Sequence, residues 1–103
     1  MAEFVTVAGR SEVPAGEMLI VEVAGEEIVL ANVDGHIYAF GNGCTHRGGP
    51  LGEGLLDGDE VECPFHQGRF NVKTGEAVQP PPTEPVATYE VQVEGDDIRV
   101  AKG

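Results

Sequence analysis

The most informative stretch of the sequence is Cys63-Pro64-Phe65-His66-Gln67-Gly68-Arg69-Phe70. A similar stretch precedes it, Cys44-Thr45-His46-Arg47-Gly48-Gly49-Pro50-Leu51. Each stretch carries one cysteine and one histidine, in the patterns C-x-x-H and C-x-H respectively. Both cysteines of the chain and two of its three histidines lie here. Thiolates and imidazoles bind transition metals, and close spacing lets one turn present both from the same side. The two stretches therefore predict a metal centre.

Glycines flank these candidate ligands, at Gly48 and Gly49 in the first stretch and at Gly68 in the second. A glycine lets the backbone approach a metal centre without a Cβ clash, and it lets amide N–H groups point inward. Inward-pointing amides favour an anionic group at the centre, such as a sulfide.

Segments typical of β-strands precede and follow the two stretches. Asp34-Gly35 is a pair that favours a type I′ hairpin turn, and the segment from Gly41 to Gly58 is glycine-rich without periodicity, which predicts a loop. A single helical turn is expected near Ser11 to Pro14, and no long helix. The sequence predicts strands over 18–23, 27–33, 36–40, 60–63, 69–72, 86–93 and 97–101, with turns at 24–26 and 94–96.

Length and charge limit the function classes. The 103 residues fit one domain. The net charge of −12 argues against nucleic acid and anionic membranes as partners, and it favours a soluble protein whose acidic surface steers encounters with basic partner proteins. No stretch approaches the roughly 20 apolar residues of a membrane span, and the N-terminus does not resemble a signal peptide. A cytoplasmic location is expected.

The two stretches resemble the ligand loops of the Rieske family, in which two histidines replace two cysteines on one iron of a [2Fe–2S] cluster. The resemblance implies one cluster, with Cys44 and Cys63 on the buried iron and His46 and His66 on the outer iron. It implies an all-β Rieske (ISP-like) fold, an antiparallel β-sandwich or barrel base with a glycine-rich two-loop insertion. The single domain of residues 1–103 would have a cluster-binding part at about 42–72 and base strands at about 1–41 and 76–103.

The resemblance also implies which residues surround the cluster. A proline-containing loop covers its third side in the family, and Pro80 and Pro81 stand at the matching place. Partner proteins would dock over a tip that includes Arg47 and Gln67, beside the two histidines. Gly48 belongs to the same loop surroundings.

Departures from the respiratory branch of the family indicate a low potential. Respiratory members join an extra cysteine from each loop in a disulfide, and Gly49 and Phe65 stand at those positions here. They also donate hydrogen bonds to the cluster sulfurs from a serine and a tyrosine, where this chain has Gly68 and Phe70. Fewer donors destabilise the reduced state, so we expect a potential of about −150 mV, near the low end of the Rieske range.

This combination resembles the ferredoxin component of bacterial aromatic ring-hydroxylating dioxygenase systems, which serve aromatic hydrocarbon catabolism. The implied function is electron transport without catalysis: a monomer takes single electrons from a flavoprotein ferredoxin reductase and passes them to a terminal oxygenase.

Three other interpretations remain open at this point. The small subunit of a nitrite reductase also resembles a short Rieske domain. A Cys₂His₂ set can bind structural zinc, although zinc fingers usually pair cysteine with cysteine and histidine with histidine. A Cys63–His66 nucleophile would leave Cys44 and His46 unexplained, and no orienting Asn or Asp motif accompanies it. The third histidine, His36, follows a turn and is expected to be an ordinary surface residue.

Overall fold

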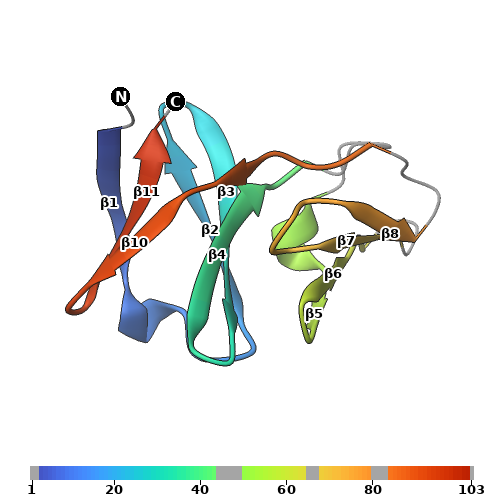
Figure 1. Ribbon diagram of the computed structural model, residues 1–103, viewed down its shortest axis with the longest axis horizontal. Coiled ribbons are helices and arrows are strands. Elements are labelled where there is room, and N and C mark those ends of the chain that lie inside the picture. The colour runs from blue at the N-terminus through green and yellow to red at the C-terminus, as the bar shows by residue number, and fades with distance from the viewer. Residues whose placement is uncertain (1–2, 44–49, 65–67, 80–83, 103) are drawn as a thin grey trace.

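Antiparallel strands make up most of the chain in this computed structural model (Figure 1). The structure describes residues 3–43, 50–64, 68–79 and 84–102. Within those ranges, helical structure is limited to two 3₁₀ turns, η1 (Arg10–Glu12) and η2 (Leu51–Glu53). None of the helical turns in those ranges is long and apolar enough to cross a membrane. The predicted all-β fold class is confirmed.

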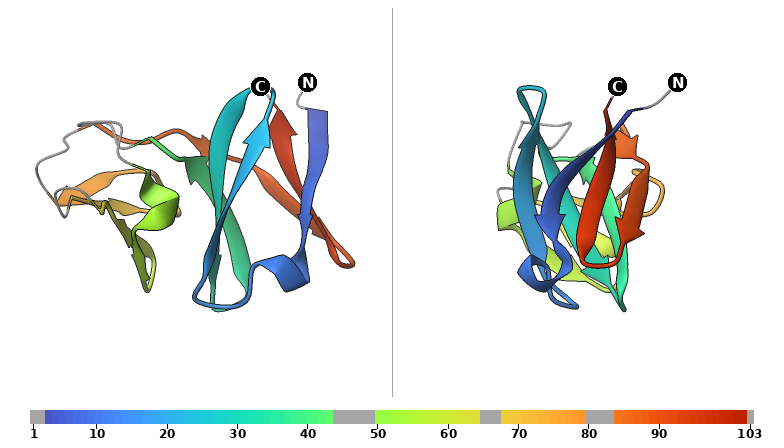
Figure 2. Two further views of the ribbon diagram at one scale, coloured as in Figure 1. Left: turned by 180° about the vertical axis from the view of Figure 1, so that it is seen from behind. Right: turned by 90° about the vertical axis from the view of Figure 1, so that its left-hand side faces the viewer.

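Two antiparallel sheets form the base of the molecule and lie face to face (Figures 1 and 2). The strands are β1 (Glu3–Gly9), β2 (Met18–Val23), β3 (Glu26–Val33), β4 (His36–Gly41), β9 (Thr88–Tyr89), β10 (Val91–Glu94) and β11 (Asp97–Lys102). One sheet has the order β1-β11-β10, and the other has the order β2-β3-β4-β9.

Two tight turns set the register of the second sheet. Asp34 and Gly35 between β3 and β4 have φ angles of 52° and 92°, and Ala24 and Gly25 between β2 and β3 have φ angles of 53° and 85°. Positive φ at both central residues is the signature of a type I′ turn, whose twist matches that of the flanking strands. The hairpin predicted at Asp34-Gly35 is therefore confirmed.

A third, smaller sheet lies beside the β2-β3-β4-β9 sheet (Figure 1). Its strands pair in the order β5-β6-β7-β8. The prediction of an unbroken loop from Gly41 to Gly58 was wrong, because Leu55–Asp57 pairs as a strand with Glu60–Glu62. The four strands are β5 (Leu55–Asp57), β6 (Glu60–Glu62), β7 (Arg69–Asn71) and β8 (Ala77–Gln79).

The C-terminal part changes sheets where the sequence predicts one continuous strand over 86–93. Thr88–Tyr89 pairs with β4, whereas Val91–Glu94 pairs with β11 in the other sheet. The pairing is interrupted at Glu90, where the chain crosses from one sheet to the other. The prediction of one continuous strand was therefore wrong, although most of these residues do form strands.

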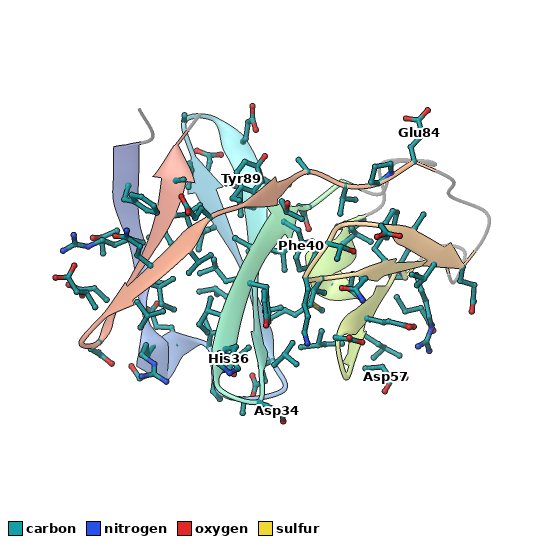
Figure 3. The ribbon with its side chains drawn as sticks, viewed as in Figure 1. Asp34, His36, Phe40, Asp57, Glu84 and Tyr89 are labelled. Carbon is teal, nitrogen blue, oxygen red and sulfur yellow. The ribbon has the colours of Figure 1, made fainter. Side chains whose placement is uncertain are left out.

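The β2-β3-β4-β9 sheet packs against a core on each of its two faces. Ile28 and Leu30 of β3 belong to the core between the two base sheets, while Val29 and Ala31 belong to the core shared with the third sheet. Phe40 of β4 joins the second core and lies between the base and the third sheet in Figure 3. The β3 strand thus connects the base to the part of the chain that carries the predicted ligands.

Candidate metal centre

The second predicted ligand loop begins at Cys63, directly after β6. The Cys63 side chain is fully buried and belongs to a core cluster that includes Val61 and Phe70. Its backbone N–H donates a hydrogen bond to the carbonyl oxygen of Gly68, with an N···O distance of 2.8 Å. This bond closes the loop at its base. The side chains of Phe65, His66 and Gln67 lie outside the described residues.

The residues on either side of the first predicted ligand loop are also joined to each other. Gly43 and Pro50 form an isolated antiparallel bridge, and the N–H of Leu51 donates to the carbonyl of Asn42 at 2.8 Å. Leu51 is fully buried in the same core cluster as Cys63. The two loops therefore start from one core. The predicted residues Cys44, His46, Arg47, Gly48 and Gly49 lie outside the described residues.

Asn42 stabilises the base of the first loop, and sequence reasoning missed it. Its side chain is only 5% exposed. Its Nδ2 donates to Oε1 of Glu27 at 3.0 Å, and its Oδ1 accepts a hydrogen bond from the N–H of Gly52 at 2.8 Å. Buried polar groups of this kind are almost always paired. The sequence offers no signal for this role, because an asparagine beside glycines is equally typical of an ordinary turn.

The third predicted segment starts beside the second loop. Gln79, the last residue of β8, is the cross-strand partner of Arg69, which directly follows Gly68. The backbone therefore brings the chain to the base of the second loop immediately before Pro80. Both Pro80 and Pro81 lie outside the described residues.

Arg69 is the charged centre of the third sheet, and no role was predicted for it from the sequence. Its Nη2 lies 2.9 Å from Oε1 of Glu62, and its Nη1 lies 3.0 Å from Oδ2 of Asp57 and 3.4 Å from Oε1 of Glu60. The carboxylates of Asp57 and Glu62 raise the pKa of Arg69 above its ordinary value. The guanidinium is charged at any working pH. The missed signal was the Glu60 and Glu62 alternation facing an arginine across a short hairpin.

His36 lies away from the bases of both loops. It is exposed at the opposite end of β4 from Gly41 (Figure 3). Together with Arg10 and Val93 it lines an open cavity of about 380 Å³. Its predicted surface position is confirmed.

The donor chemistry at Cys63 fits an iron–sulfur centre. A fully buried thiol at the end of a strand is held away from water, and iron–sulfur clusters are bound by cysteine thiolates in partly shielded sites. The described ranges contain no group of three or more His, Cys, Asp or Glu side chains placed to hold a metal ion.

Comparisons with known proteins agree with this chemistry. Residues 3–90 match the Rieske [2Fe-2S] domain. The ferredoxin component of a naphthalene 1,2-dioxygenase system from Pseudomonas aeruginosa is 46% identical over 89 residues, which cover 86% of each chain.

Solved structures give the same result. The ferredoxin of carbazole 1,9a-dioxygenase from Nocardioides aromaticivorans IC177 superposes with a TM-score of 0.93 at 34% identity, covering 97% of this chain and 98% of that one. A chain from a complex of reduced oxygenase and oxidized ferredoxin in carbazole 1,9a-dioxygenase has a TM-score of 0.90 at 37% identity, covering 95% and 92%. Nitrite reductase small subunits are similar at 22% identity or less, which shows the fold alone. The chain belongs to the Rieske [2Fe-2S] domain family.

Proposed function

We propose that this protein is a one-electron carrier between a flavoprotein ferredoxin reductase and a terminal ring-hydroxylating oxygenase. In this proposal Cys44 and Cys63 hold one iron of a single [2Fe–2S] cluster, and His46 and His66 hold the other. The relatives are named as ferredoxin components of aromatic dioxygenase systems, which confirms the prediction of an electron carrier rather than an enzyme.

The observation that carries the proposal is the likeness to a ferredoxin in a complex with its oxygenase, at 37% identity over 95% of this chain. That likeness supports a terminal oxygenase as one partner. The reductase follows from the composition of such systems, in which a ferredoxin needs an electron donor. A carrier that serves two partners in turn needs one accessible face near its redox group.

The described residues would support the cluster in three ways. Burial in the core fixes the thiol of Cys63 relative to β6. The bond from the Cys63 N–H to the Gly68 carbonyl keeps the second loop closed. Leu51 anchors the first loop in the same core, so both loops are held together. When bound, the cluster would accept and release one electron, and its two neutral imidazoles would leave the oxidised form without net charge.

The potential is expected to be low for a Rieske protein. Gly68 has no side chain, and the Phe70 side chain is fully buried in the apolar core and carries no polar atom. Neither residue can donate a side-chain hydrogen bond to a cluster sulfur. We expect a potential of about −150 mV. Docking over the tip formed by Arg47, Gln67, Pro80 and Pro81 completes the proposal.

The ligand set is tested by removing both histidines of the loops. The His46→Ala/His66→Ala variant and a His36→Ala control are purified side by side, and iron content, visible absorption and electron paramagnetic resonance of the dithionite-reduced protein are measured. The control is expected to keep two irons per chain and a signal with a mean g below that of an all-cysteine cluster. The double variant is expected to lose both.

Two results would contradict the proposal. Retention of iron and spectrum in the double variant would exclude histidine ligation. A colourless wild-type protein with one zinc per chain would favour the structural zinc alternative. For the function, reduced protein is mixed with a terminal oxygenase of an aromatic dioxygenase system, and substrate-dependent reoxidation is expected. Reoxidation only by a nitrite reductase would favour the small-subunit alternative.

A further inference from the structure

The second ligand loop depends on a very short base. Six residues, Cys63 to Gly68, connect β6 to β7, and each of these strands has only three residues. One described backbone bond, from Cys63 to Gly68, closes the loop. Short paired segments of this size are marginally stable by themselves. Other contacts must therefore keep the two strands together where they enter the loop.

Glu62 and Arg69 face each other at that entrance. They are cross-strand partners, one residue before Cys63 and one residue after Gly68. Because bonded and non-bonded pairs alternate along an antiparallel ladder, the bond between Cys63 and Gly68 makes this neighbouring pair a non-bonded one. Side chains lie closer in such pairs. Both the Nε and the Nη2 atoms of Arg69 contact Oε1 of Glu62, at 3.2 and 2.9 Å.

The Arg69–Glu62 pair is also partly buried, and Arg69 makes a further contact. Its side chains are only 25% and 21% exposed, and Nη1 of the same guanidinium lies 3.0 Å from Oδ2 of Asp57 on β5. Arg69 therefore connects three of the four strands of the third sheet. The ion pair between Arg99 and Glu94 in the base provides a contrast. Its single contact is 3.3 Å long, and its side chains are 37% and 70% exposed.

We propose that Arg69 and Glu62 are positioning residues that clamp the entrance of the second ligand loop and thereby slow the loss of the cluster. The inference rests on the proposed ligand set, in which Cys63 and His66 belong to this loop. Neither clamp residue is itself a ligand in that set. Their effect would act through the separation of the two strand ends, and so through the geometry in which the loop presents its ligands.

The test compares cluster loss and reduction potential in four variants. Arg69→Ala, Glu62→Ala, the Arg69→Ala/Glu62→Ala double variant and an Arg99→Ala control are loaded with the cluster. The decay of visible absorption is followed in excess iron chelator, and the potential is measured in parallel. Both single clamp variants are expected to lose the cluster roughly two- to fivefold faster than wild type, the range for a partly exposed ion pair. The double variant should lose the cluster no faster than the more impaired single variant, because each single variant already removes the Arg69–Glu62 ion pair.

Comparing the potential with the rate of cluster loss separates a clamp from a simple field effect. Removing the positive Arg69 should lower the potential, whereas removing the negative Glu62 should raise it. A clamp instead makes both variants lose the cluster faster. Arg99→Ala removes the same charge far from the loop and should keep the wild-type rate of loss.

Several outcomes would overturn the inference. The first is that both clamp variants lose the cluster no faster than Arg99→Ala does. The second is that one single variant speeds the loss of the cluster while the other slows it. The third is that the factor by which the double variant speeds the loss equals the product of the two single factors. A wild-type protein that never assembles a histidine-ligated cluster would instead refute the proposed function. The two failures are therefore distinguishable.

Discussion

Gly54 lies between η2 and β5, and its replacement by alanine tests how closely the two segments that carry the proposed ligands must approach. A Cβ built at Gly54 would overlap the carbonyl oxygen of Glu62 and would lie 3.0 Å from its carbonyl carbon and 3.2 Å from Cδ of Pro64. The obstructing atoms belong to the backbone and to a proline ring, so they cannot rotate away. The φ of Gly54 is −84°, so the cost comes from this contact and not from a left-handed backbone.

The expected cost follows from that geometry. Overpacking a filled site destabilises by about 1–3 kcal/mol, and an obstructing backbone places Gly54→Ala near about 3 kcal/mol. For a domain of this size, 1 kcal/mol lowers the melting temperature by about 4–8 °C, so a fall of about 12 °C or more is expected. The strand end that is pushed away carries Cys63, so the cluster absorption should decay at the lowered temperature as well.

The assay is thermal unfolding followed by circular dichroism and by visible absorption, at one scan rate because cluster loss can make unfolding irreversible. Gly41→Ala is the matched control. Gly41 has open space around its Cα and no positive φ, so alanine there should change stability by at most about 0.5 kcal/mol. Equal apparent melting temperatures for Gly54→Ala and Gly41→Ala would refute the argument from close approach.

Three further predictions follow from the charges and the layered core. Burial raises the pKa of Tyr89, and the negative charge of Glu26, 3.3 Å from its hydroxyl, adds to the effect. Stability that depends on neutral Tyr89 is therefore present below about pH 10 and is lost as the pH rises through the raised value. Denaturant midpoints of Tyr89→Phe should fall less than those of wild type at high pH, and an equal fall would contradict this. In the protein without iron, hydrogen exchange should remain slow for amides of β3 and become fast for β6 and β7, because metal binding is coupled to local folding; equal protection with and without iron would argue against it. The net charge of −12 should make reduction by a flavoprotein reductase slower at high salt, and rates independent of ionic strength would exclude electrostatic steering.

Local signals in the sequence predicted the base of the fold. The run Met18–Val23 and the pair Asp34-Gly35 predict a strand and a turn from the properties of their own residues, and both are observed. The three-residue strands Leu55–Asp57 and Ala77–Gln79 were not predicted. Neither segment alternates apolar and polar residues, and each is a strand because it pairs with its neighbour in a short hairpin, β5 with β6 and β8 with β7. The break at Glu90 was missed for a related reason, since nothing local indicates which sheet each half will join.

The candidate site divides in the same way. The proposed ligand pattern is visible in the sequence, because thiol and imidazole side chains are rare and their spacing is short. The supporting residues Asn42 and Arg69 belong to common residue types. Their roles arise only when the fold brings them to Gly52 and Glu27, or to three carboxylates on neighbouring strands.

The double burial of β3 gives a physical reason for placing a metal centre on such short strands. Alternate residues of β3 face two different cores, with Ile28 on one side and Val29 on the other. The long hairpins of the base can therefore form by local pairing and then offer an apolar face to Leu51, Val61 and Phe70. The third sheet needs to supply little stability itself, because the base and the bound metal would both contribute. Its outer face is then available for charged side chains such as Arg69, whose contacts stabilise the loop entrance without occupying either core.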